Sequence, residues 1–420
     1  MNNVSDANLI LQVGKIIYEL WWIIFPTIFF YVFKILWIDF SGWYSIDSWY
    51  NSQEWILLEV VPPREIEKGP QLMENFFVGL SGVLTTYNTF DEYLKGAWYH
   101  DRFGLELVGV EGKIHFYIRT QKKYRNMIEA QIYAQYPDAE IVEAPDYTEN
   151  FPEMIPNKNW DLWGTDFEFI NKDPIPIKTY DKFEESITGE MIDPMSAIAE
   201  VLGKLGPGQH IWLQYILQPL PEQEFKKYEA LIKKLKGEIE AKSLSYLDHL
   251  TDVAANIPKG IFSEVSFKSS EKKEQQPLEF RLSPMEKEIL KETEENLGRN
   301  LFKTKMRFIY LARKENFDKA SIGTFIGAIK QFNDINLNSV KPNDRSKTYG
   351  VILNKEKRAD FRKRKIYDRY KKRNVDGAKM FFSTKELATM FHFPDMGVKS
   401  PAVLRTTSKL GSAPANLPVE

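Results

Sequence analysis

The sequence predicts an α+β fold in which one N-terminal transmembrane helix is followed by two tandem ferredoxin-like modules, the second with a long helical insertion. Three observations carry this prediction. An apolar, aromatic run lies near the N-terminus, a βαββαβ order of hydrophobic patterns occurs twice after it, and a Lys- and Glu-rich stretch interrupts the second copy. Because this order is the signature of a split βαβ unit, each copy is assigned to the ferredoxin-like arrangement.

The composition is that of a globular protein, because 43% of its 420 residues are hydrophobic and 27% are charged. The length suits two or three domains. A net charge of −2 gives no whole-chain attraction to nucleic acid or to an acidic surface, so any such signal must be local. The absence of cysteine excludes disulfides, cysteine-type zinc sites and thiol nucleophiles, and it fits a reducing compartment.

Residues 16–38 form the predicted transmembrane helix, after an N-terminal tail of residues 1–15. At about 1.5 Å rise per residue this stretch spans roughly 35 Å, which is enough to cross a hydrocarbon core of about 30 Å. A cleaved signal peptide would show a basic start and a small-residue cleavage site, and the stretch has neither. A buried core helix would rarely carry aromatic residues on every face.

The residues at the ends of the apolar run predict how the helix is anchored. Tryptophans lie at both ends, as in the aromatic belts of spanning helices, and a lysine can extend its amine to the interface. A proline inside the run is tolerated in membrane helices. Residues 39–53 are predicted as an interfacial linker. The predicted anchor residues are Trp21, Trp22, Pro26, Lys34 and Trp37.

The first ferredoxin-like module is predicted over residues 54–150. Its strands are expected at residues 54–61, 104–110, 113–119 and 139–143, and its helices at residues 71–87 and 122–136. Glu111 and Gly112 stand between the second and third strands, and this dipeptide predicts a tight hairpin.

The second module is predicted over residues 151–395. Its first three strands are expected at residues 166–170, 209–217 and 304–311, and its helices at residues 194–205 and 320–332. Two segments compete for the fourth strand, residues 378–382 and the segment near Val351. The helical insertion covers residues 221–301, with helices expected at 223–249 and 284–300.

The search for catalytic chemistry gives no candidate. The five histidines do not fall at the spacing of a helical metal site, and neither a Walker phosphate-binding motif nor a GxGxxG motif occurs in the sequence. No catalytic residue, metal ligand or cofactor is therefore predicted, and the chain is not expected to be an enzyme.

A cationic segment, residues 355–373, is the candidate binding site. It holds eleven Lys or Arg and three acids, a net charge of +8, and as a helix it carries aromatic residues between its cations. Three alternatives stay open: a solvated helix, a patch for the anionic cytoplasmic leaflet, and a nucleic-acid contact in which cations meet phosphates and rings meet bases. The candidate contacts to nucleic acid or lipid are Arg358, Arg362, Arg364, Lys365, Tyr367, Arg369, Tyr370, Lys372 and Arg373.

The C-terminal segment begins with a short strand and a helix. Ser383 or Thr384 is the expected N-cap of that helix, and Glu386 lies in its first turn, where a carboxylate is favourable. Residues 396–420 are rich in proline and predict an extended linker toward an absent or separate domain.

The run STKELATMFHFP, followed by PANLP, resembles the stretch just before the ATPase module of membrane-anchored conjugative DNA-transfer proteins of bacteria, the type IV secretion coupling type. The run EWILLEVVPPREIEKGPQLMENFFVGLSGV is similar to the start of their non-catalytic N-terminal region. The resemblance covers residues 54–418. In that family the next element is a P-loop motor, which this sequence lacks, so no catalytic residue is carried over.

The resemblance implies a non-catalytic membrane-anchoring and partner-binding part of a type IV secretion coupling complex. It would position a P-loop ATPase encoded elsewhere or lost by truncation. The expected partners are the lipid bilayer and the ATPase module or subunit, with DNA and a second copy of the chain as open alternatives. The expected location is the cytoplasmic membrane, with a single pass and the body in the cytoplasm. The alternative function is a membrane-tethered scaffold or substrate-recruiting receptor unrelated to DNA transfer.

Overall fold

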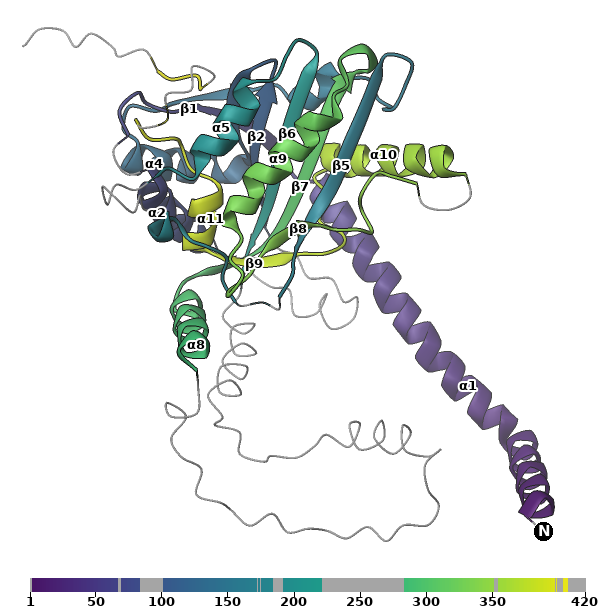
Figure 1. Cartoon of the computed structure of the whole chain (residues 1–420). Helices are drawn as coiled ribbons and strands as arrows, with labels where there is room; N and C mark the ends of the chain where they lie inside the picture. The colour runs from purple at the N-terminus through teal and green to yellow at the C-terminus, as the bar shows by residue number, and fades with distance from the viewer. Residues whose placement is uncertain are drawn as a thin grey trace, which may run out of the picture.

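The protein is described by a computed structural model, in which a long N-terminal helix projects from a body built on one β-sheet (Figure 1). The structure describes residues 2–66, 69–83, 101–171, 173, 175–183, 192–220, 283–350, 354–396, 398 and 403–406. The predicted α+β class is confirmed, with an antiparallel sheet at its centre. The helix predicted at residues 223–249 lies outside the described residues.

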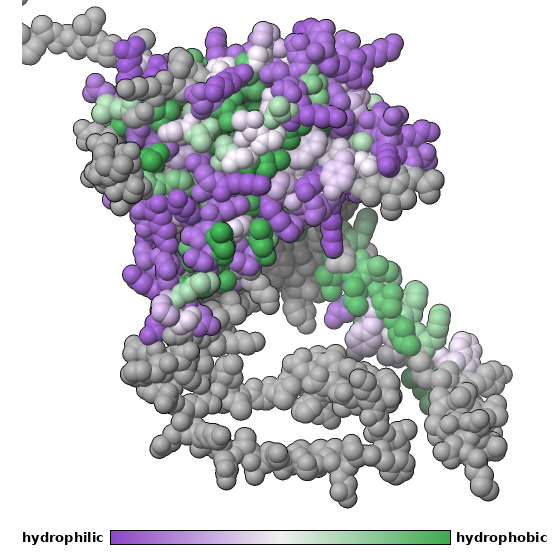
Figure 2. All heavy atoms as spheres, viewed as in Figure 1, coloured by the Kyte–Doolittle hydropathy of each residue, from purple (hydrophilic) through white to green (hydrophobic). Residues whose placement is uncertain are grey.

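The first helix, α1 (Asn2–Asn51), contains the apolar run. Its segment Glu19–Asn51 is long and apolar enough to cross a membrane, by length and composition, and no side chain of its most apolar window is buried. Pro26 lies inside the helix, and beside it the Thr27 hydroxyl donates to the carbonyl of Ile23 at 2.7 Å. Residues 39–51, predicted as an interfacial linker, continue the helix. Figure 2 shows apolar side chains along α1 against a largely hydrophilic body.

Among the residues that the structure describes, the first half of the sheet has four strands and two α-helices. In chain order its elements are β1 (Trp55–Val61), α2 (Gly69–Ser81), β2 (Phe103–Val110), β3 (Lys113–Gln121), α4 (Arg125–Gln135) and β4 (Glu140–Ala144). The strands pair antiparallel in the spatial order β4-β1-β3-β2. Between β2 and β3, Glu111 has φ 49° and Gly112 has φ 86°, so both adopt the positive φ of a tight two-residue turn, as predicted.

The second half repeats this composition of elements. They are β5 (Trp160–Phe169), α5 (Met195–Gly203), β6 (Gln209–Pro219), β7 (Leu301–Arg313), α9 (Lys319–Ile329) and β8 (Val340–Pro342). Its strands lie in the order β6-β7-β5-β8. Helix α8 (Pro284–Leu297) precedes β7 and begins with a capping box between Ser283 and Glu286, which satisfies backbone donors at its N-terminus.

The two halves are joined into one continuous sheet. Strand β2 pairs with β6 along its whole length, from Phe103 opposite Leu217 to Val110 opposite His210. The result is a nine-stranded sheet. An edge strand with unpaired backbone groups is prone to pair with another strand, and here each half covers such an edge of the other.

The sheet buries apolar side chains on both faces. Helices α2, α4, α5, α9 and α11 (Thr384–Met390) cover one face, and α10 (Lys355–Lys371) lies against the other (Figure 1). Alternation along a strand divides its side chains between these faces. In β1, for example, Ile56 and Leu58 belong to the larger core, whereas Leu57 packs in the core under α10.

The strand predicted at residues 378–382 is present, but it does not take the place of the fourth strand of the second half. Strand β9 (Met380–Ser383) pairs with the first residues of β7 instead of completing the second half beside β5. That place is taken by β8, which pairs with Phe167 to Phe169 of β5. The predicted cap of α11 is confirmed, because Ser383 and Glu386 form a capping box.

Candidate functional site

The candidate site is built around α10, which is fixed to the body by contacts from the middle of the helix. The amine of Lys363 lies 2.6 Å from Asp161 of β5, and Ile366 packs into the core beneath the helix. Arg362 donates to the carbonyls of Lys347 and Tyr349, at 3.1 Å each. These contacts leave the opposite face of the helix to solvent.

A row of polar side chains crosses the sheet under the end of α10. The row runs over four adjacent strands, because Glu106 of β2 stands opposite Gln214 of β6, Gln214 opposite Arg307 of β7, and Arg307 opposite Asp166 of β5. All four are nearly or fully buried. Gln214 donates to Glu106 at 2.9 Å, and Arg307 Nε donates to Asp166 at 2.9 Å. Buried polar groups need partners, and this row supplies them.

The polar row holds the end of α10. Arg307 donates to the backbone carbonyl of Arg369 at 2.8 Å, one of the carbonyls that a helix end leaves without an intrahelical partner. It also donates to the carbonyl of Asn374, beyond the helix, at 3.0 Å. Gln214 reaches the carbonyl of Tyr370 at 3.3 Å. Lys305, two residues before Arg307 on β7 and on the same face of the sheet, pairs with Asp166 at 2.7 Å. Burial lowers the pKa of the Lys305 amine, against the opposing effect of the Asp166 carboxylate.

Arg373 closes the helix and joins it to the first half of the sheet. It was predicted as a helical contact residue, but α10 ends at Lys371 and Arg373 has φ 49°, in the left-handed region. Its side chain is buried and bonds to Glu106 and to Asp146. Burial alone would raise the pKa of Glu106, but the Arg373 guanidinium and the Tyr147 hydroxyl outweigh it and hold that pKa below its ordinary value.

The two predicted tyrosines are buried, and the interpretation that their rings meet exposed bases is wrong. Tyr367 is 1% exposed and Tyr370 is fully buried. The Tyr367 hydroxyl donates to the carbonyl of Pro152, and the hydroxyls of Tyr370 and Tyr147 lie 2.7 Å apart. The spacing of the two rings along the helix therefore marks its core-facing side.

The exposed face of α10 carries the remaining predicted cations. Arg358, Arg364 and Lys365 are exposed, Arg369 is half-buried, and Lys372 pairs with Asp368 at 2.9 Å just after the helix ends. Two further residues on this face were not among the candidates. They are the exposed cation Lys357 and Phe361, whose side chain is 66% exposed.

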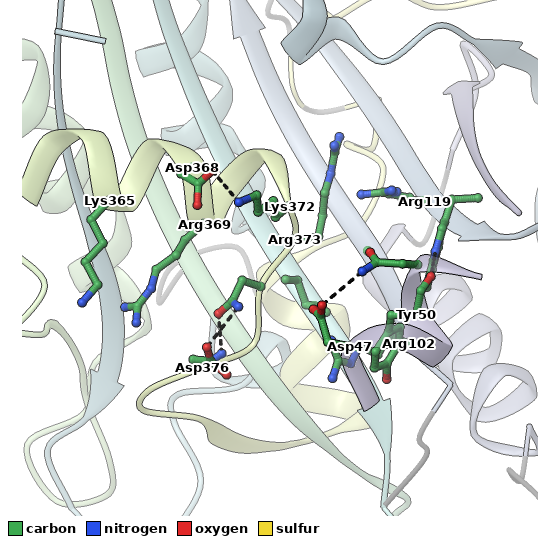
Figure 3. Close-up of a pocket in the computed structure, with 15 residues that line it drawn as sticks. Asp47, Tyr50, Arg102, Arg119, Lys365, Asp368, Arg369, Lys372, Arg373 and Asp376 are labelled. Carbon is green, nitrogen blue, oxygen red and sulfur yellow. Dashed lines mark hydrogen bonds and ion pairs between the residues drawn. The ribbon is translucent and has the colours of Figure 1, made fainter. Parts of the chain in front are cut away.

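Two hollows flank the helix. One, of about 1030 Å³, is lined by Asp166, Arg358, Phe361 and Arg362 among others. The second, of about 670 Å³, lies between the end of α10 and the last turn of α1 (Figure 3). Lys365 and Arg369 line both hollows.

The second hollow contains residues that sequence reasoning missed. Arg102 precedes β2 and Arg119 lies on β3, and both line the hollow beside Asp47 and Tyr50 of α1. One signal was present in the sequence, because Arg119 alternates with Ile118 and so shares a strand face with Tyr117. That these residues line one hollow could not be predicted from the sequence, because they come from different elements of the fold.

The predicted anchor residues all lie on α1 and are exposed. They are Trp21, Trp22, Pro26, Lys34 and Trp37. Two histidines that were weighed as metal ligands have carboxylate neighbours instead: His115 Nδ1 lies 2.6 Å from Glu59, and His392 Nε2 lies 2.8 Å from Asp193. Within the described ranges no cluster of three or more His, Cys, Asp or Glu is placed to hold a metal ion.

The comparisons with known proteins agree with the extent of the folded body. No curated protein matches the chain. A family model, described as Domain of unknown function (DUF8128), matches residues 48–406, which covers the end of α1, the whole sheet and α10. The chain therefore belongs to this family.

Proposed function

We propose that the protein is a membrane-anchored platform of a type IV secretion coupling complex, which holds a P-loop ATPase at the membrane and contacts DNA through α10. The observation that carries the DNA contact is the exposed face of α10, where four cations surround one exposed ring. These residues are Lys357, Arg358, Phe361, Arg364 and Lys365. The assignment to DNA transfer itself comes from the sequence resemblance at residues 383–394.

The proposed anchor is α1, as a single transmembrane pass with the body in the cytoplasm. Its exposed apolar side chains from Leu20 to Trp37 would be covered by lipid, which removes them from water. We also infer that each half of the sheet is a ferredoxin-like module. The antiparallel orders β4-β1-β3-β2 and β8-β5-β7-β6 support this inference, as does the βαββαβ order of each half.

The proposed DNA contact is mainly electrostatic, because the cations would neutralise backbone phosphates without reading bases. Phe361, instead of Tyr367 and Tyr370, would provide the ring that stacks on a base. An exposed ring among cations suits a single strand, where stacking is worth about 1–3 kcal/mol per base, better than a duplex, whose bases are already stacked.

The test measures binding of the full chain, in nanodiscs of neutral lipid, to labelled duplex and single-stranded DNA over a range of salt concentrations. The variant Lys357→Glu/Arg358→Glu/Arg364→Glu should flatten the slope of log K against log salt on duplex by about two to three, at roughly 0.9 per lost phosphate contact. Phe361→Ala should weaken single-stranded binding about tenfold and duplex binding much less.

A matched control reverses three exposed lysines away from α10, as Lys287→Glu/Lys291→Glu/Lys319→Glu. It changes the net charge by the same amount, so it should leave the salt slope unchanged if α10 is the contact. Equal losses in both triple variants, or wild-type binding without salt dependence, would refute the DNA contact and favour the alternative of a membrane-tethered scaffold. Capture of a P-loop ATPase by the nanodisc-bound chain tests the coupling role separately.

A further inference from the structure

The hollow between α1 and α10 is rich in cations. Three parts of the chain meet there: the last turn of α1, the strands β2 and β3, and the end of α10 (Figure 3). Three acids line it, Asp47, Asp368 and Asp376. The cations that line it are Arg102, Arg119, Lys365, Arg369, Lys372 and Arg373.

Two of these six cations form salt bridges within the described part of the chain. Arg373 pairs with Glu106 and Asp146, and Lys372 pairs with Asp368. Among the residues that the structure describes, no salt bridge involves Arg102, Arg119, Lys365 or Arg369. The hollow therefore keeps a net excess of positive charge, which favours an anion.

Arg102 and Arg119 are held in place by aromatic rings. The Arg102 guanidinium lies 3.5 Å from the ring centre of Tyr50, and that of Arg119 lies 5.1 Å from Trp55. The Nε of Arg102 is buried, and it has no hydrogen-bond partner within the described part of the chain. A buried donor without a partner is unfavourable, and an anion close to the guanidinium would offset part of that cost.

The surrounding pKa values agree with an excess of positive charge. Burial, together with the Arg373 guanidinium, lowers the pKa of Arg119 to about 10. Burial, together with Lys303 and Arg102, lowers the pKa of Lys379 to about 8. Both cations would be stabilised by an anion nearby, because each shift includes repulsion from neighbouring cations.

We propose that this hollow binds a phosphate group, supplied either by the headgroup of an anionic phospholipid or by a small soluble phosphate. Arginine is suited to phosphate because its planar guanidinium presents several donors in one fork. The bound phosphate would also connect the end of α1 to the end of α10, since both line the hollow.

The position of the hollow on α1 places it at the membrane surface. The exposed apolar and aromatic residues of α1 continue from Leu20 through Phe40 to Tyr44. That length is roughly 37 Å at 1.5 Å per residue, close to a bilayer of about 40 Å with its headgroups. Asp47 follows Tyr44 by less than one helical turn, so the hollow would open where headgroups lie.

The experiment uses the full chain in a neutral detergent. Native mass spectrometry measures how many phosphatidylglycerol and phosphatidylcholine molecules are retained, and calorimetry measures binding of inorganic phosphate. The double variant Arg102→Gln/Arg119→Gln should lose the preference for phosphatidylglycerol and weaken any phosphate binding at least tenfold. Arg102→Lys/Arg119→Lys keeps both charges and should retain part of each, and it also serves if the glutamine variant does not fold.

The control Lys357→Gln/Arg364→Gln removes two charges from the exposed face of α10, outside the lining of this hollow. It should bind lipid and phosphate like the wild type. Loss of lipid preference alone identifies a headgroup site, and loss of phosphate binding as well identifies a site that also takes soluble phosphate. Loss of phosphate binding alone, without any lipid preference in the wild type, identifies a site for soluble phosphate. A wild type with neither lipid preference nor phosphate binding, or equal losses in variant and control, would overturn the proposal.

This inference does not depend on the proposed DNA contact. The Arg102→Gln/Arg119→Gln variant should keep the wild-type salt slope of duplex binding. The Lys357→Glu/Arg358→Glu/Arg364→Glu variant should keep the wild-type preference for phosphatidylglycerol. If either the DNA contact or the phosphate site is refuted, the test of the other proposal can therefore still be interpreted.

Discussion

Arg373 Nε lies 3.0 Å from Glu106 Oε1, and this bond joins the residue after α10 to a strand 267 positions earlier in the chain. Both side chains are buried, at 7% and 0% exposure. Glu106 also accepts from the Tyr147 hydroxyl at 2.7 Å and from Gln214. The pair is thus a fully bonded charge pair that fixes α10 against the first half of the sheet.

Breaking this pair should be costly. Arg373→Met leaves the Glu106 carboxylate buried without its main countercharge, and the loss of one partner of a buried pair costs about 3–5 kcal/mol. Glu106→Gln should cost a similar amount. The matched control is Lys372→Met, which breaks an exposed pair with Asp368 and should cost less than about 1 kcal/mol. The measurement is the unfolding free energy from denaturant titration. Equal small losses in all three variants would contradict this account.

Stability should depend on pH through Glu386. Burial raises the pKa of this carboxyl from 4.5 to about 7, although the backbone amides of Ser383 and Ile177 bond to it. Because the folded pKa is above the unfolded one, the stabilisation is present below pH 4.5 and is lost as the pH rises to about 7. The unfolding free energy should fall by about 3 kcal/mol over this window, at about 1.4 per pKa unit. Glu386→Gln should remove that slope, and an unchanged slope would show that another group causes it.

The full chain should remain in the membrane pellet after alkaline carbonate extraction. Deletion of residues 1–40 should move it to the soluble fraction, because the deletion removes the exposed apolar side chains but keeps Asp47 and Tyr50 against the body. A full chain that carbonate extracts would not span the membrane. Because the chain has no cysteine, Lys287→Cys gives one thiol whose labelling in intact cells reports the orientation. Labelling from outside would contradict a cytoplasmic body.

The purified chain should not hydrolyse ATP. Its sequence has no Walker motif, whose backbone amides and lysine would otherwise neutralise the phosphates. The measurement is phosphate release at millimolar ATP, with a P-loop ATPase as the positive control. Saturable ATP binding at one site per chain in the micromolar range would contradict the prediction.

The local elements could be predicted from sequence because their signals are local. The hairpin between β2 and β3 follows from Glu111 and Gly112, and the cap of α11 follows from Ser383 and Glu386. Strand β8 was missed because it has only three residues, too few for a period of two to be visible.

The site could not be predicted to the same extent because its signals are long-range. The row from Glu106 to Asp166 depends on the register of four strands, and a lone charge in an apolar strand does not reveal its partner. Tyr367 and Tyr370 were assigned to bases because two rings at this spacing fit an exposed stripe as well as a buried one. The pairing of β2 with β6 had no sequence signal at all.

The connection between α1 and β1 has a mechanical consequence. Only residues 52–54 separate the helix from the strand, and β1 is bonded to β3 on one side and to β4 on the other. A pull along α1 would therefore be transmitted to β1 through these three residues, and the hydrogen bonds of β1 to β3 and β4 would bear it. Force between the membrane and any machine attached to the body would pass through the middle of the first half of the sheet.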